Sequence, residues 1–441
     1  MVKEVDKKNK YAYLIMILGI IIRFITNFYA RVDVFQHDIT FNNAGHFDYA
    51  KYIYENNMLP NTNYYEFAQP PINAYLQALV MKIMSFVINR NVSLIKLYSY
   101  TKILSFIFSV ITLIIIYKII KEFDVNEFLS NIFIAIFSFY PGLIIMNTQY
   151  SNDPISYMFF YLSIYIALIW IKNKKMSTII LLALSIGIGM LTKVSVGLVA
   201  FVVGPILLIG LYSSYREDKK NKNGYANFKN VILMLTVFML IVFPIGLSYS
   251  VRNYILFGQK FGEIFDIAVG TKLDLSLKNY SIYDRYIKFA FDRLFDKECN
   301  IFHDYYEYNI WVDLIKTSTF DEFTFVKYYP FKNFYPLLVI IYILNLLFWF
   351  IGILSIGYNI SYISSIEKSV DNFFINKDNK FTINSLIILS LLLFAIAIIS
   401  YIYFNVRYAR SCNSNYRYIA YITFALASSI ISSMHLIKCK I

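Results

Sequence analysis

Long apolar runs recur along this chain, and its polar residues collect in the segments between them. A run of about twenty apolar residues forms a helix long enough to cross roughly 30 Å of hydrocarbon. The runs are continuous rather than alternating, which favours helices. They lie at 11–30, 97–120, 129–147, 155–171, 176–191, 194–212, 231–250, 334–357, 383–404 and 417–437. The pattern predicts an all-α polytopic membrane protein, a single transmembrane domain over residues 1–437.

Residues 72–89 fit either a further crossing or a helix in the membrane interface. If they crossed, the basic clusters at 172–175 and 216–229 would face outward, against the excess of Lys and Arg that cytoplasmic loops carry. Polar residues also interrupt the apolar face, as in interfacial helices; they are Asn73, Gln77 and Lys82. We therefore predict an interfacial helix at 72–89.

This topology places both termini in the cytoplasm and the two longest loops outside. Residues 31–96 form the first outer loop, and 252–333 form the larger one, a candidate lid or acceptor-binding segment. Apolar and charged residues at 281–296 follow a helical spacing, which predicts a helix on the membrane surface. The first crossing ends without a cleavage site and is expected to stay as an anchor. Its Arg23 is expected to snorkel toward the outer boundary.

Composition supports membrane residence. The 441 residues are 58% hydrophobic and 16% charged, against roughly 45–50% apolar and 25% charged in soluble domains. The net charge of +13 is explained by cytoplasmic loops such as 213–230 and 358–382 and by contacts with anionic lipid head groups, so we expect no nucleic-acid partner. Frequent Ile, Lys, Asn, Tyr and Phe suggest an AT-rich genome and a bacterial cell membrane.

Titratable residues gather on the predicted outer side. The stretch 36–71 holds two of the four histidines and several acidic residues. The candidates for chemistry are His37, Asp38, His46, Asp48, Asn152, Asp153, Lys193, Arg252 and Arg417. Fixed cations hold phosphate by charge-assisted hydrogen bonds, and a carboxylate can take the proton of an acceptor hydroxyl. The set therefore suits a lipid-linked anionic substrate.

Each candidate also has a purely structural explanation. A loop carboxylate such as Asp38 is often only solvated or a helix cap, and Asp153 fits a cap for the next helix. His46 at a helix start fits a structural role, and Arg252 at a membrane boundary fits snorkelling. A metal site formed by His37, Asp38 and His46 has loose spacing for metal ligands. We expect no cofactor and no required divalent metal.

Short motifs on the predicted outer side follow one order along the chain. They are His37-Asp38, Gly45-His46-Phe47-Asp48-Tyr49-Ala50, Leu59-Pro60, Pro70-Pro71, Ser151-Asn152-Asp153-Pro154, Leu191-Thr192-Lys193, Val251-Arg252-Asn253-Tyr254, Ile310-Trp311, Lys316-Thr317-Ser318 and Tyr416-Arg417-Tyr418-Ile419. In this order they resemble the GT-C superfamily of polyprenyl-phosphate-sugar-dependent glycosyltransferases. The resemblance is closest to the bacterial branch that is similar to protein mannosyltransferases and aminoarabinose transferases.

The resemblance implies a GT-C-like helical bundle and transfer of a sugar from a polyprenyl-phosphate donor, by direct displacement with inversion. Asp38 matches the family's catalytic carboxylate, and Asp48 is the alternative if the register differs. Lys193, Arg252 and Arg417 become candidate ligands of the donor phosphate.

The chain departs from its relatives at two positions. Gln69 stands where His is frequent, and Ile39 follows Asp38 where many relatives carry an Asp-Glu pair. The remaining candidates, His37, His46, Asp48, Asn152 and Asp153, are expected to bind substrate or support the loops.

We therefore predict a membrane glycosyltransferase with its active site on the extracytoplasmic face. Its partners would be the lipid-linked donor, membrane lipids, and a glycan, lipid or protein acceptor. Three other classes stay open. A transporter or flippase of lipid-linked saccharide would need charges at mid-membrane, which these runs hardly contain. A polysaccharide polymerase or ligase would use the same outer cations, and a scaffold would use none of them.

Overall fold

The computed structural model describes residues 10–29, 45–88, 92–146, 148–222, 224–263, 277, 279–295, 307–321, 334–365, 374–376, 378–410 and 413–440. The regular secondary structure of these residues is helical, and no strand occurs among them. Seven of their helical segments are long and apolar enough to cross a membrane: Lys10–Tyr29, Leu94–Lys121, Asp153–Asn173, Val194–Asn221, Ala226–Phe257, Tyr335–Ser365 and Ile383–Arg407. The predicted all-α polytopic membrane protein is confirmed.

The chain divides into two compact units. Unit 1 comprises Met1–Thr26, Phe123–Asn147 and Ala268–Ile441, and unit 2 comprises Asn27–Glu122 and Thr148–Ile267. Each unit is therefore assembled from segments far apart in sequence.

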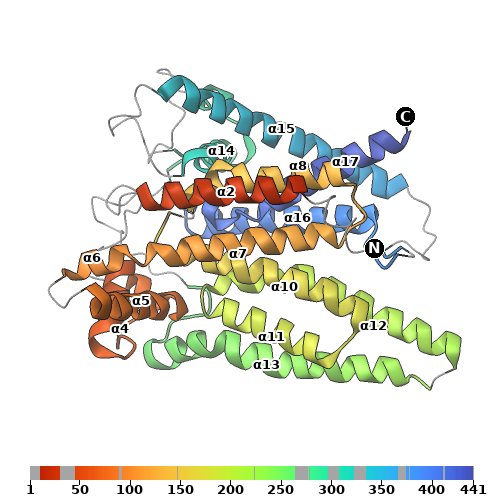
Figure 1. Ribbon diagram of the computed structural model, residues 1–441, viewed down its shortest axis with the longest axis horizontal. Coiled ribbons are helices and arrows are strands. Elements are labelled where there is room, and N and C mark those ends of the chain that lie inside the picture. The colour runs from red at the N-terminus through yellow and green to blue at the C-terminus, as the bar shows by residue number, and fades with distance from the viewer. Residues whose placement is uncertain are drawn as a thin grey trace. The chain divides into compact units, whose positions relative to one another are not determined.

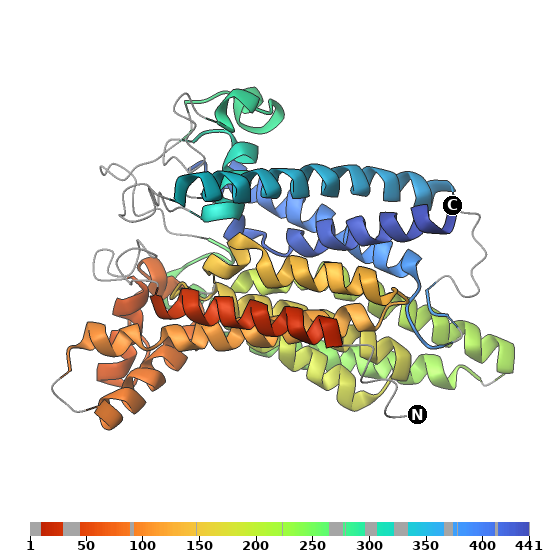
Figure 2. The ribbon, with the colours of Figure 1, turned by 45° about the horizontal axis from the view of Figure 1, so that its top comes forward.

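Unit 2 is a bundle of long helices with short helices at one end. Its elements are α4 (His46–Asn56), η2 (Tyr65–Ala68), α5 (Ile72–Ile88), α6 (Leu94–Ser99), α7 (Lys102–Lys121), α10 (Asp153–Asn173), α11 (Met176–Met190), η3 (Val194–Val199), α12 (Ala200–Asn221) and α13 (Ala226–Phe257). The long helices α7, α10, α11, α12 and α13 run side by side, and α4, α5 and α6 gather at one end of them (Figures 1 and 2). A helix over 72–89 is confirmed, whereas its place in the membrane interface stays a prediction.

Small residues allow the helices of unit 2 to pack closely. A Cβ at Gly246 of α13 would come within 2.7 Å of the Met190 sulfur on α11, and one at Gly187 within 3.0 Å of Ile245. Such contacts let the backbones of membrane helices approach each other. Helix α13 ends at Gly258, whose φ of +67° favours a residue without a side chain.

Unit 1 places a short buried helix among longer ones. Its elements are α2 (Lys10–Tyr29, up to Thr26), α8 (Glu127–Phe139), α9 (Pro141–Met146), η4 (Tyr283–Ile287), η5 (Phe291–Arg293), α14 (Ile310–Phe320), α15 (Tyr335–Ser365), α16 (Ile383–Arg407), η9 (Tyr416–Tyr418) and α17 (Ile422–Lys440). Helix α17 packs against α8, α15 and α16, and α14 packs against α9 and α15. Every residue of α14 except Trp311 is buried.

The predicted crossing at 129–147 is wrong as a single helix. It breaks at Tyr140 into α8 and α9, because Pro141 has no N–H to continue the hydrogen-bond ladder. The carbonyls left at the end of α8 are satisfied by Arg23, which donates to Phe137 O and Ser138 O, each at 2.6 Å. Arg23 is buried, so the expected snorkelling is also wrong.

Several predicted boundaries shift as well. Residues 213–230 were expected to be a loop, but α12 continues to Asn221 and α13 begins at Ala226. The segment 358–382 is helical up to Ser365. Within 281–295 the structure has only the η4 and η5 turns instead of one surface helix. The run at 417–437 begins as helix only at Ile422, after the η9 turn.

Candidate active site

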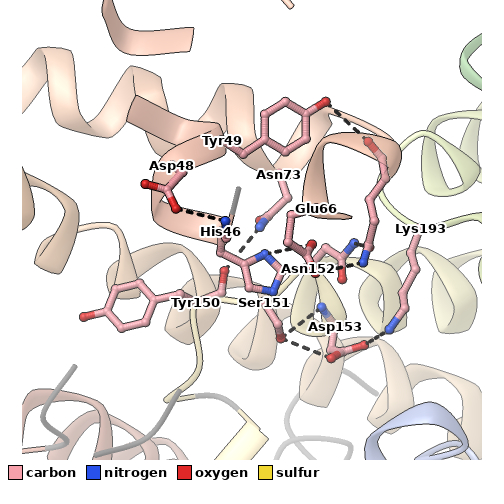
Figure 3. Close-up of polar contacts among 12 residues, drawn as sticks. His46, Asp48, Tyr49, Glu66, Asn73, Tyr150, Ser151, Asn152, Asp153 and Lys193 are labelled. Atoms are coloured by element: carbon pink, nitrogen blue, oxygen red, sulfur yellow. Dashed lines mark hydrogen bonds and ion pairs between the residues drawn. The ribbon is translucent and has the colours of Figure 1, made fainter. Parts of the chain in front are cut away.

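Four segments of unit 2 bring a connected set of polar side chains together (Figure 3). They are the start of α4, the η2 turn with the residue that follows it, the loop into α10, and the turn between α11 and η3. We call this set the unit 2 site and define it by His46, Glu66, Gln69, Asn152, Asp153 and Lys193.

His46 and Glu66 form the first link. The imidazole Nδ1 lies 3.2 Å from Glu66 Oε2, and both side chains are less than a tenth exposed. Gln69 donates from Nε2 to the other carboxylate oxygen of Glu66 at 3.1 Å. A buried carboxylate is costly unless it is paired and hydrogen-bonded, so these contacts fix the start of α4 against the η2 turn.

Asn152 carries the network to the next segment. Its Nδ2 donates to Gln69 Oε1 at 2.7 Å and to the carbonyl of Thr192 at 3.0 Å. Asn152 is also the N-cap residue of α10, yet its side chain makes no capping bond. The amide is thus used to join the α10 start to Gln69 and to the residue before Lys193.

Lys193 pairs with Asp153 at the far end of the network. The ammonium contacts Asp153 Oδ1, and the other carboxylate oxygen accepts from Ser151 Oγ at 3.1 Å. The Asp153 side chain is 3% exposed, whereas that of Lys193 is 18% exposed. The expected cap role of Asp153 is wrong, since Asn152 is the N-cap and Asp153 binds a cation.

Arg252 lies in the last two turns of α13 rather than directly after a crossing. Its guanidinium donates to the carbonyl of Pro60 at 2.9 Å and to Asn253 Oδ1 at 2.8 Å. It also stacks over the ring of Tyr249 at 5.3 Å. Arg252 is partly exposed and is held against the segment between α4 and η2.

Tyrosine hydroxyls connect the Arg252 region to Gln69. The hydroxyls of Tyr49 and Tyr249 lie 3.0 Å apart, and Tyr249 donates to the carbonyl of Phe67 at 2.7 Å. Tyr49 reaches the carbonyl of Gln69 at 3.3 Å. Lys193 and Arg252 therefore border one continuous hydrogen-bonded network.

Asp48 has a different role from its neighbours. Its carboxylate accepts from the N–H of Gly45 at 2.9 Å and completes the capping of α4. Burial raises the pKa of the Asp48 carboxyl above its ordinary value, although the Gly45 bond and Lys51 oppose the shift. Its contacts here are those of a helix cap.

The remaining candidates lie outside unit 2 or outside the described residues. His37 and Asp38 lie outside the described residues. Arg417 belongs to unit 1, where it sits on η9 with its guanidinium 5.3 Å from the Tyr418 ring centre and 3.3 Å from the Tyr418 hydroxyl.

Unit 1 contains a second polar cluster that sequence reasoning missed. The Glu307 carboxylate accepts from Arg293 Nε at 2.9 and 3.0 Å and from the N–H of Asn309 at 2.9 Å. Burial raises the pKa of Glu307, and those two partners oppose the shift. Asp313 and Lys316 on α14 are also buried. The only sequence signal was the short Ile310–Ser318 motif inside an expected loop.

Glu66 was missed too, although it stands three residues before Gln69 in the turn that resembles the family. As for metals, no group of three or more His, Cys, Asp or Glu side chains suited to a metal ion occurs among the residues that the structure describes. The His37–Asp38–His46 alternative involves residues outside that set.

The long apolar helices and the partly exposed Lys193 and Arg252 fit a membrane protein that binds an anion. Comparison with protein families defines the class: residues 21–257 match the family described as dolichyl-phosphate-mannose-protein mannosyltransferase. The chain belongs to this family, and with it to the GT-C superfamily. It is a multi-pass membrane glycosyltransferase that uses a polyprenyl-phosphate sugar donor. No curated protein matches the chain.

Proposed function

We propose that the enzyme transfers a hexose, mannose in the first instance, from a polyprenyl phosphate to a hydroxyl group on the extracytoplasmic face. The family description names mannose and a protein acceptor, so a protein hydroxyl is the first acceptor to test. We also propose a bacterial cell membrane as the location, with both termini in the cytoplasm.

The reaction is a single displacement at the anomeric carbon. The acceptor oxygen forms a bond to C1 while the bond from C1 to the phosphate oxygen breaks, and that electron pair leaves with the polyprenyl phosphate. The acceptor proton passes to the carboxylate of Asp38, acting as general base. Attack opposite the leaving group inverts the configuration at C1.

Lys193 and Arg252 would hold the phosphate as it leaves. Fixed cations that face developing negative charge stabilise the transition state in a water-poor site. The observation that carries the proposal is the unequal exposure of the ion pair. The Asp153 side chain is buried, whereas the Lys193 side chain is 18% exposed. An incoming phosphate can reach the exposed part of the lysine and compete with its present partners for the N–H donors of the ammonium. Arg417 is a third candidate, from unit 1.

The test is release of lipid phosphate. The purified full chain in nanodiscs is incubated with polyprenyl-phosphate [14C]mannose and a Ser/Thr-rich peptide. We expect radiolabel on the peptide and stoichiometric free polyprenyl phosphate from the wild type, and neither product from Asp38→Asn. Glu122→Gln serves as the control, because it neutralises a carboxylate of unit 2 that pairs with Lys172.

Other outcomes identify the competing classes. Movement of intact donor across a vesicle without release of lipid phosphate would indicate a flippase. Use of a pyrophosphate-linked oligosaccharide in preference to the monosaccharide donor would indicate a polymerase. Equal turnover by Asp38→Asn, with an unchanged melting temperature, would remove Asp38 from the mechanism.

A further inference from the structure

The ion pair of Lys193 and Asp153 is asymmetric. Both carboxylate oxygens of Asp153 are engaged, Oδ1 by Lys193 and Oδ2 by Ser151 Oγ at 3.1 Å. Asp153 is the first residue of α10, which anchors its backbone, and its side chain is 3% exposed. The carboxylate is therefore fixed in place, and the partly exposed lysine is the only member of the pair that a ligand can reach.

A fixed carboxylate is unexpected next to a cation that binds phosphate. Two negative groups that share one ammonium repel each other, and the repulsion is strong where little water screens it. A site built only for tight binding of phosphate would contain neutral hydrogen-bond partners for Lys193 instead. Such partners are at hand in this site, since Gln69 and Asn152 are neutral amides.

A purely structural role does not account for the placement of this charge. The N-cap position of α10 is held by Asn152 rather than by Asp153. A carboxylate in the first turn does interact favourably with the helix dipole. However, one of its oxygens contacts Lys193 of the unit 2 site and the other contacts the neighbouring Ser151 (Figure 3).

We propose that Asp153 is an affinity-setting residue: it acts as a built-in counter-ion that competes with phosphate for Lys193. In the empty site it holds the ammonium in position. After transfer it weakens the hold of Lys193 on the polyprenyl phosphate product, so that the product leaves and the next donor enters. This inference rests on the proposed role of Lys193 as a phosphate ligand.

The experiment measures binding of polyprenyl phosphate, without a sugar, to the purified full chain in nanodiscs. Asp153→Asn keeps the shape of the side chain and removes its charge. We expect it to bind polyprenyl phosphate about tenfold more tightly than the wild type, and to show a correspondingly lower inhibition constant for this product. Glu122→Gln removes the carboxylate partner of another lysine of unit 2, Lys172, without touching Lys193, so its dissociation constant should stay at the wild-type value.

A second variant protects the test against misfolding. If Asp153→Asn melts at a lower temperature than the wild type, Asp153→Ser is used, which also removes the charge and keeps a hydrogen-bonding group. Weaker or unchanged binding by a variant with the wild-type melting temperature overturns the inference.

Lys193→Gln separates this inference from the proposed function. If that variant binds polyprenyl phosphate as the wild type does, Lys193 is not a phosphate ligand and the proposed role itself fails. If Lys193→Gln binds weakly but removal of the Asp153 charge does not tighten binding, only the counter-ion inference fails.

Discussion

Lys193 in unit 2 and Lys316 in unit 1 both lie among apolar helices, but their surroundings differ. The Lys193 side chain is 18% exposed and pairs with the buried carboxylate of Asp153. Lys316, in contrast, is 2% exposed within the buried helix α14. The family match covers residues 21–257 and so includes the first lysine but not the second. We interpret the unit 2 site as the part that binds substrate. We interpret the unit 1 cluster of Arg293, Glu307, Asn309, Asp313 and Lys316 as a part that stabilises the fold.

The difference is one of accessibility rather than of residue type. A buried ion pair contributes little net stability, but removing one partner leaves a charge that the interior cannot solvate. A cation with an exposed side can instead pass some of its hydrogen bonds to a ligand. Changes in the unit 1 cluster around Glu307 should therefore reduce stability, and changes in the unit 2 site should alter ligand binding and turnover.

Glu307→Ala should have the largest effect on stability. It removes the carboxylate partner of Arg293 and leaves the N–H of Asn309 without that acceptor. We expect the free energy of unfolding to fall by about 3 kcal/mol. This is the lower end of the range for breaking a buried ion pair, because Arg293 is partly exposed. Thermal unfolding in detergent measures it, and the activity per folded molecule should match the wild type. If the variant is as stable as the wild type but inactive, Glu307 takes part in the reaction and the structural interpretation is contradicted.

Gly142→Ala should destabilise unit 1 by steric conflict alone. A Cβ at Gly142 of α9 would lie 2.4 Å from the backbone oxygen of Ser318 on α14. Backbone cannot move aside as a flexible side chain can, so we expect a cost of about 2 kcal/mol. The melting temperature checks this. No change in that temperature would show that α9 and α14 pack less closely than described.

Gln69→Ala tests whether the unit 2 network serves binding. It removes the link between Glu66 and Asn152, which should cost about 1–2 kcal/mol of stability. We also expect kcat/KM for the donor to fall about tenfold, because Asn152 helps to place the turn that carries Lys193.

The matched control for Gln69→Ala lies in unit 1. Asn345 is a buried amide that donates to Ser318 and Thr319 at 2.9 and 2.6 Å. Asn345→Ala should lose a similar amount of stability while kcat/KM per folded molecule stays unchanged. Equal kinetic losses in both variants would mean that kinetics only report stability.

Asp48→Asn should have the smallest effect. Burial raises the pKa of the Asp48 carboxyl in the wild type, so folding favours its protonated form. The stability that this protonation contributes is fully present below the pKa of the unfolded state, and it is lost as the pH rises through the pKa of the folded state. At neutral pH the Asn variant should therefore equal or slightly exceed the wild type, within about 0.5 kcal/mol. On acidification the wild type should gain stability relative to the Asn variant. The difference between their free energies of unfolding, measured between pH 3 and 7, checks this. A difference that moves the other way contradicts the raised pKa.

The sequence predicted the parts of this structure that depend on local pattern. Apolar runs marked the helices, and the polar segments between them marked the Asn152–Asp153 and Lys193 turns. Pro141 is a local signal for the break at Tyr140, but local pattern could not show that Arg23, more than a hundred residues away, satisfies the carbonyls of α8.

Hydrogen bonds between residues far apart in the sequence likewise could not be predicted from local sequence patterns. The Asn152–Thr192 bond spans 40 residues and the Tyr49–Tyr249 bond spans 200. Helix α14 was missed because its charged residues resembled those of an exposed loop, although the tertiary structure buries them. The phosphate-binding roles of Lys193, Arg252 and Arg417, and the catalytic role of Asp38, remain predictions.

The most direct test of the central claim is the donor kinetics of Lys193→Gln. Initial rates of lipid-phosphate release are measured against the concentration of polyprenyl-phosphate mannose, with the melting temperature as the check on folding. Our account predicts that kcat/KM falls at least about tenfold, because a charge-assisted contact to the phosphate is lost. An unchanged kcat/KM in a variant that melts like the wild type would contradict it.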